Sequence, residues 1–275
     1  MKLVINKITE QIIVKTAANL PQSILLTGPV GVGLTEIAKH IANLKSIKPI
    51  IILPEKDEKV DLEKGIISVE IMRRLYDEVR TKTNVERIII IDYTETMTTQ
   101  AQNAFLKLLE EPAAGVYFIL LSHTATKLLP TILSRVDKIN IRPVSAQQSN
   151  DILDELKITD TTKRAQIMFI APGLPAEIIR LCMDNEYFAS RSSIIRDARE
   201  LLRGTTYQKL LIAHKYKDNR ANTLILLNDA AKMLQTSVSA NPQIDSIKFI
   251  DRILNAYQQI EANGNIRLCL ARVVL

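Results

Sequence analysis

A glycine-rich turn near the amino terminus is the first stretch whose residue types and spacing could do chemistry. Gly28, Gly31 and Gly33 stand close together and are followed by Leu34 and Thr35, which gives the spacing G-x-x-x-x-G-x-T. Backbone N–H groups of such a loop, at the start of a helix, can hold phosphate oxygens. The lysine that would reach the outer phosphates is replaced by Leu34, which carries no charge. We therefore expect a phosphate-binding loop that has lost its cation.

A carboxylate and an arginine further along the chain could complete phosphate chemistry. Asp92 follows the isoleucines at positions 88–91, a run that predicts a strand buried on both faces. Ligands bind at the carboxyl edge of such strands, although Asp92 could also simply cap the turn there. Arg135 follows Ser134 after a short predicted helix. Its planar guanidinium could stabilise charge on a transferring phosphoryl group.

Positioning these side chains requires a parallel sheet flanked by helices. Strands alternate with amphipathic helices in the first half of the chain, an order typical of crossover βαβ units. Beyond residue 146 the pattern is helical without a convincing strand. We expect strands at 23–27, 48–53, 88–91, 116–121 and 138–142, and helices at 7–18, 34–45, 69–82 and from about Thr98 to the residue before Pro112.

The composition is that of a globular protein with an aliphatic core. The chain has 275 residues, 47% hydrophobic and 4% aromatic, and no Trp. The net charge is +6, and residues 186–275 carry 13 basic against 8 acidic side chains. No apolar run approaches the roughly 18 residues of a membrane span, and the amino terminus lacks a signal-peptide core. We expect a cytoplasmic protein with no membrane partner and with free thiols at Cys182 and Cys269.

Longer motifs around Arg135 carry a resemblance to a known family. Residues 103–112 read N-A-F-L-K-L-L-E-E-P, and residues 128–135 read L-L-P-T-I-L-S-R. The chain resembles the clamp-loader branch of the AAA+ proteins, and within it the delta-prime subunits of bacterial DNA polymerase III clamp loaders. The resemblance implies an α/β fold: a RecA-like module with a parallel sheet at residues 1–143, a small helical lid at 144–185 and an all-α collar for oligomerisation at 186–275.

The same resemblance implies a role inside a ring of subunits. The partners would be the gamma/tau and delta subunits, the sliding clamp, and primed DNA through the assembled ring. Ser134 and Arg135 match the family's S-R-C motif, whose arginine reaches the ATP held by the neighbouring subunit. Val136 stands where the family has cysteine, but the arginine that the chemistry needs is present.

Several positions depart together from the pattern of an active ATPase in this family. Leu34 replaces the loop lysine, Tyr93 follows Asp92 in place of the catalytic glutamate, and Ala176 replaces the lid arginine. Thr35 and Asp92 are retained, so weak binding of ATP or ADP with Mg²⁺ stays open. Residues 44–54 contain no Cys or His, so we expect no zinc site, and apart from Mg²⁺ that would bind with a nucleotide we expect no metal.

These observations favour a non-hydrolysing stator subunit of the DNA polymerase III clamp loader. It would help to load the sliding clamp and would supply Arg135 in trans. One alternative is an ATP-hydrolysing motor subunit of the same complex that uses another lysine, for which Lys39 is the candidate. A second alternative is an AAA+ adaptor outside replication. ATP hydrolysis by the purified chain would discriminate between the stator and the motor.

Overall fold

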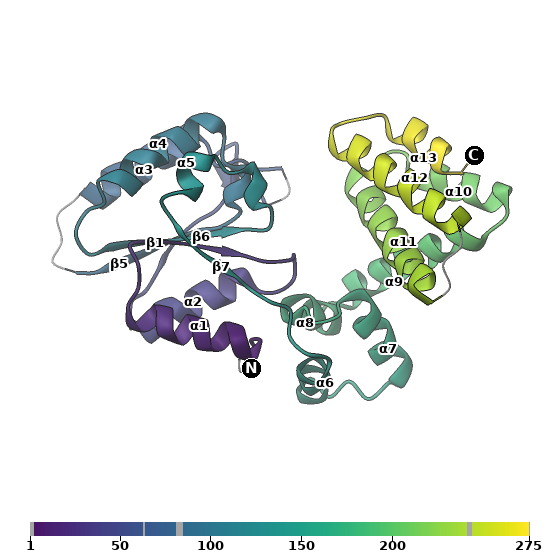
Figure 1. Ribbon diagram of the computed structural model, residues 1–275, viewed down its shortest axis with the longest axis horizontal. Coiled ribbons are helices and arrows are strands. Elements are labelled where there is room, and N and C mark those ends of the chain that lie inside the picture. Colours follow the sequence, from purple (N-terminus) through teal and green to yellow (C-terminus); the bar gives the residue numbers. More distant parts are fainter. Residues whose placement is uncertain (1–2, 63, 81–84, 241–243, 275) are drawn as a thin grey trace. The chain divides into compact units, whose positions relative to one another are not determined.

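The computed structural model describes residues 3–62, 64–80, 85–240 and 244–274 (Figure 1). The chain divides into two compact units, Met1–Cys182 and Met183–Leu275. The first unit contains the sheet with its covering helices, and the second is helical throughout its described residues. Each unit is described by itself below.

A five-stranded parallel sheet forms the centre of the first unit. Its strand order is β2-β5-β6-β1-β7, and every pairing is parallel. The carboxyl ends of the strands therefore meet at one edge, as the sequence predicts for Asp92 and the glycine loop. The strands are β1 (Ser23–Thr27), β2 (Ile50–Ile52), β5 (Arg87–Ile91), β6 (Val116–Ser122) and β7 (Asp137–Asn140).

Helices cover both faces of this sheet, so the central strands are buried on both sides (Figure 1). The isoleucines of β5 alternate between two cores: Ile89 and Ile91 pack with Phe105, whereas Ile88 and Ile90 pack with Ile37. One face carries α1 (Lys7–Ala18) and α2 (Leu34–Leu44); the other carries α3 (Val69–Arg80), α4 (Thr99–Glu110) and the short α5 (Pro130–Leu133). Short 3-10 turns, η1 (Thr94–Thr96) and η2 (Ala125–Lys127), complete the connections.

Helices make up the rest of the chain. The first unit ends with α6 (Ala146–Glu155), α7 (Thr161–Ile170) and α8 (Pro175–Met183), the last of which crosses the boundary between the units by one residue. The second unit has its own core, which includes Leu226, Ile253 and Leu270. Its helices are α9 (Asn185–Arg203), α10 (Thr206–Tyr216), α11 (Arg220–Ala240), α12 (Ile244–Glu261) and α13 (Ile266–Val274). The lid and collar assignments of residues 144–185 and 186–275 stay predictions.

The connection after β2 is where the sequence-based expectation was incomplete. It contains a hairpin of β3 (Glu55–Lys56) and β4 (Lys59–Val60). The hairpin turns through Asp57 and Glu58, both with positive φ (52° and 60°). Two-residue hairpin turns with positive φ at both positions favour Asn-Gly. The sequence Asp57-Glu58 therefore does not indicate a hairpin.

Two predicted strands differ from the observed ones at their ends, and one predicted helix extends beyond the described residues. The strand predicted at 48–53 is Ile50–Ile52, and the strand predicted at 138–142 is Asp137–Asn140. The helix predicted at 69–82 is described as far as Arg80, and Lys82 lies outside the described residues.

Candidate functional site

The glycine loop joins β1 to α2, as the sequence predicts. Gly31 and Gly33 have φ of 87° and 92°, a left-handed backbone region that favours glycine. Gly33 is the residue immediately before α2. Gly28 lies just after β1, with its backbone close to Ile141. The order of strand, glycine turn and helix start is thus that of a phosphate-binding loop.

Leu34 is buried where a phosphate-binding loop would carry its lysine. Its side chain is 3% exposed and belongs to the same core cluster as Val32 and Ile37. Leu174, from the segment just before α8, packs against this cluster. The position therefore contributes to the apolar core and offers no positive charge to an anion.

The start of α8 contacts the glycine loop directly. The carbonyl oxygen of Gly31 accepts the backbone N–H of Ala176 at 2.9 Å and that of Glu177 at 3.2 Å. A Cβ added at Gly31 would lie 2.7 Å from the Cβ of Glu177, whereas one added at Gly33 would lie 3.6 Å from that of Ala176. N–H groups in the first turn of a helix lack intrahelical partners and are often used to bind anions. Here two of them bind the loop itself.

Thr35 and Asp92 lie together beside the loop. The Thr35 hydroxyl donates to Asp92 Oδ2 at 2.6 Å, and Asp92 Oδ1 accepts the Tyr93 N–H at 2.9 Å. Both are hard oxygen ligands of the kind that Mg²⁺ takes, usually together with water and nucleotide phosphates. Among the described residues no group of three or more His, Cys, Asp and Glu could hold a metal ion. The pair therefore fits Mg²⁺ only as part of a site completed by phosphate.

Tyr93 follows Asp92 with a left-handed backbone (φ 52°). Burial raises the pKa of its phenol above the ordinary value, the negative charges of Asp92 and Glu95 raise it further, and Arg180 opposes them. Tyr93 therefore stays protonated at neutral pH. A neutral phenol cannot replace a carboxylate as the base that activates water.

Glu95 and His123 extend this cluster in a way that the sequence did not predict. The ring nitrogen Nδ1 of His123 lies 2.8 Å from the Gly28 carbonyl oxygen. The backbone N–H of His123 donates to Glu95 Oε1 at 3.1 Å. The Tyr93 and His123 rings meet edge to face. These contacts join the turn after β5, the residue after β6 and the glycine loop, and no local spacing in the sequence signals them.

Arg135 lies in a different environment, next to α4 and α5. Ser134 caps the carboxyl end of α5. One terminal nitrogen of Arg135 donates to the Thr131 carbonyl at 3.0 Å and, weakly, to the Ser134 hydroxyl at 3.4 Å. The other lies 2.9 Å from Glu110 Oε1, and the Arg135 side chain is 38% exposed. The predicted site residues thus form two groups: loop, Thr35 and Asp92 in one, Ser134 and Arg135 in the other.

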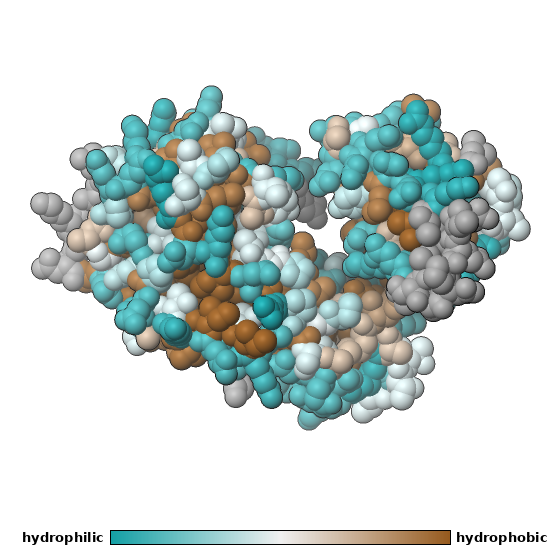
Figure 2. All heavy atoms as spheres, viewed as in Figure 1, coloured by the Kyte–Doolittle hydropathy of each residue, from teal (hydrophilic) through white to brown (hydrophobic). Residues whose placement is uncertain are grey.

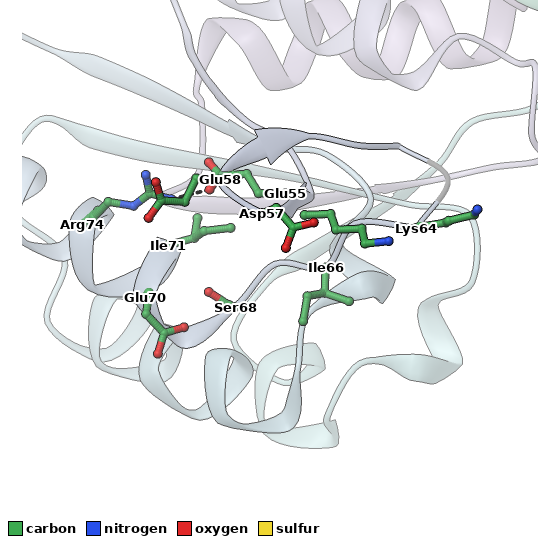
Figure 3. Close-up of a pocket in the computed structure, with 10 residues that line it drawn as sticks. Glu55, Asp57, Glu58, Lys64, Ile66, Ser68, Glu70, Ile71 and Arg74 are labelled. Carbon is green, nitrogen blue, oxygen red and sulfur yellow. Dashed lines mark hydrogen bonds and ion pairs between the residues drawn. The ribbon is translucent and has the colours of Figure 1, made fainter.

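Two further surface features belong to neither group. Figure 3 shows a hollow between the β3–β4 hairpin and α3, in which Arg74 pairs with Glu55 at 2.6 Å. Figure 2 shows hydrophobic residues gathered at the surface over α1, where Ile8 and Ile12 are exposed. Apolar surface of this kind can mark a contact with another molecule.

No helix of the described residues is long and apolar enough to cross a membrane.

Known proteins match this chain most clearly across the central motifs. Residues 45–145 match the family described as DNA polymerase III, delta subunit. The DNA polymerase III subunit delta' of Bacillus subtilis is 29% identical over 119 residues, which is 42% of this chain and 36% of the relative. The resemblance to clamp-loader delta-prime subunits is confirmed. The chain spans little more than a third of the length of that relative.

Two comparisons extend over most of the chain at lower identity. The DNA polymerase III subunit gamma of Buchnera aphidicola is 24% identical, and the match covers 89% of this chain and 80% of the relative. A solved structure of a DNA polymerase III gamma subunit-related protein from Thermotoga maritima has a TM-score of 0.56 at 18% identity, covering 97% of both chains. This likeness shows the fold, and the RecA-like AAA+ α/β fold predicted from the sequence is confirmed.

Proposed function

We propose that this chain is a non-hydrolysing stator subunit of a DNA polymerase III clamp loader. It would help to load the sliding clamp onto primed DNA, in a ring with gamma/tau and delta subunits. Arg135 and Ser134 would serve the ATP site of a neighbouring subunit. The family match at residues 45–145 supports membership of such a complex.

The observation that carries the proposal is the contrast between Leu34 and Arg135. Leu34 is buried in the core at the lysine position of the loop, so this chain's own site lacks its cation. Arg135 is partly exposed next to α5, and its partners Thr131 and Glu110 lie outside the glycine loop. An arginine retained in a chain whose own site is incomplete has a use if it completes another subunit's site.

The contact between α8 and the glycine loop supports the same conclusion. In the clamp-loader interpretation α8 belongs to the lid, and its first N–H groups bind the Gly31 carbonyl. The phosphates of a nucleotide would have to enter beside this contact without help from a loop lysine or a lid arginine. We expect ATP or ADP to bind weakly or not at all, with Thr35 and Asp92 as the retained Mg²⁺ ligands.

The alternative is an ATP-hydrolysing motor subunit, which the match to a gamma subunit over 89% of this chain favours. Its candidate lysine, Lys39, forms an ion pair with Glu36 at 2.7 Å on the exposed side of α2. Lys39 lies beyond the first turn of that helix, so it is poorly placed to replace Leu34. A motor would also lack the carboxylate that activates water, because Tyr93 stands at that position.

Titration of the purified chain with a fluorescent ATP analogue, with and without Mg²⁺, tests the proposal, together with ATP hydrolysis by the chain alone. We expect no saturable binding in the micromolar range and no turnover above background. Micromolar binding that depends on Mg²⁺ would show that the loop backbone suffices for binding. Turnover by the chain alone would replace the stator with the motor.

A further inference from the structure

Arg135, the residue proposed to act on a neighbour, is already bound within its own chain. Glu110 Oε1 lies 2.9 Å from one terminal nitrogen, and the Thr131 carbonyl lies 3.0 Å from the other. The Arg135 and Glu110 side chains are 38% and 51% exposed, so solvent and a partner can reach the pair. The arginine is thus held in one orientation, with its charge partly balanced, before any neighbour arrives.

Both members of this pair are placed by packed elements. The α4 helix starts at the Thr98 cap, packs Ala101, Phe105 and Leu108 into the core, and ends at Glu110. The α5 helix buries Ile132 in the same core cluster, which fixes the turn before Arg135. The meeting of Glu110 with Arg135 therefore follows from the packing of α4 and α5 and does not depend on a flexible segment.

A carboxylate and a phosphate compete for the same face of a guanidinium. The planar carboxylate and the tetrahedral phosphate each present a pair of oxygens that can accept parallel N–H bonds from the arginine fork. A phosphate that approached Arg135 while Glu110 stayed bound would be repelled by that carboxylate. Glu110 must therefore give up its contact when Arg135 binds a phosphate.

We propose that Glu110 is a positioning residue that holds Arg135 in cis and releases it to the terminal phosphate of a nucleotide on the neighbouring subunit. This inference rests on the proposed trans role of Arg135. The exchange is favoured most by the triphosphate, because its terminal phosphate carries the greatest negative charge there. Once that phosphate has left, Glu110 recovers the arginine.

The test is the ATPase of the assembled loader with Glu110→Gln in this chain, since glutamine keeps the shape and removes the charge. With less competition for Arg135, we expect the rate to rise about two- to fivefold, the effect expected for the loss of an exposed ion pair. Glu111→Gln, one residue further on, is the matched control and should leave the rate unchanged. Glu110→Asp, which keeps the charge, should stay closer to the wild type.

A double-mutant cycle separates this role from a structural one. In the Arg135→Ala background, Glu110→Gln should have no effect on the rate, because the residue through which it acts is gone. A rate that is unchanged or lowered by Glu110→Gln, with normal assembly, would overturn the inference while leaving the trans role intact. If Arg135→Ala itself left the rate unchanged, the proposed trans role of Arg135 would be wrong, and the inference about Glu110 would fall with it.

Discussion

Leu34 is an aliphatic residue at the position where a phosphate-binding loop carries its lysine. The loop retains its glycines, with a left-handed backbone at Gly31 and Gly33, yet the side chain at the lysine position contributes to the apolar core. An aliphatic side chain there stabilises the junction of β1 and α2 through burial. The same burial makes the position unsuited to a charge, so the change cannot be reversed by one substitution.

Leu34→Lys should therefore destabilise the first unit and should not restore nucleotide binding. Taking an ammonium group out of water without a partner costs on the order of 3 kcal/mol, reduced to the extent that the long side chain reaches solvent. Hydrogen exchange of the α2 amides and the nucleotide titration measure the two effects. Leu44→Lys, at the exposed end of the same helix, is the control and should leave both unchanged. Tight binding by Leu34→Lys would show that the missing lysine was the only defect.

The chemistry-bearing residues were predictable because their spacing is local. The glycine loop, Asp92 after a run of isoleucines and Arg135 after a short helix all stand in sequence contexts that define their backbone setting. The ion pair of Arg135 with Glu110 and the contact of His123 with Gly28 were not predictable. Each joins residues at least 25 positions apart, and only the packing of strands and helices brings them together.

At the scale of elements, the contact between the glycine loop and α8 is the feature with the clearest consequence. It satisfies two N–H groups at the start of a helix with the carbonyl of one loop residue. It also requires a close approach, because only the missing Cβ of Gly31 leaves room for Glu177. The loop thus supports the start of α8.

Gly31→Ala should weaken this contact more than Gly33→Ala does. Both substitutions force alanine into a left-handed backbone, at a cost of about 1–2 kcal/mol each. Only the first adds a clash, with its Cβ 2.7 Å from that of Glu177, against 3.6 Å from Ala176 for the second. Hydrogen exchange at the Ala176 and Glu177 amides should accelerate strongly in Gly31→Ala and little in Gly33→Ala. Equal acceleration in both would mean that backbone strain, and not the contact, is what matters.

Sequence patterns anticipated most of these elements and missed those that depend on unusual turns. The helix Lys7–Ala18 and the strand Ser23–Thr27 have the predicted bounds, because apolar periodicity and turn residues mark their ends. The β3–β4 hairpin was not predicted, because the pair Asp57-Glu58 rarely forms such a turn. The strands at Ile50–Ile52 and Asp137–Asn140 are shorter or shifted, because pairing with a neighbour decides where an edge strand ends.

At the scale of the whole molecule, the chain divides into two compact units. The first unit contains the glycine loop, Asp92 and Arg135. The second unit has an independent core and a buried ion pair, Arg191 with Asp229 at 3.0 Å. In the proposed ring this second unit would serve as the collar that joins subunits, while the first would present Arg135 to the neighbouring ATP site.

The central claim is that Arg135 acts on a neighbour's nucleotide, and the ATPase of the loader assembled with Arg135→Ala tests it most directly. Arginine fingers contribute on the order of 10³–10⁵ in rate in GTPases, and a ring with several sites should lose less. We expect normal assembly, a clear fall in ATPase and clamp loading, and partial rescue by Arg135→Lys, which keeps the charge without the fork. Arg142→Ala, at another exposed arginine, should have no effect. Normal assembly with unchanged ATPase and clamp loading in Arg135→Ala would contradict the account.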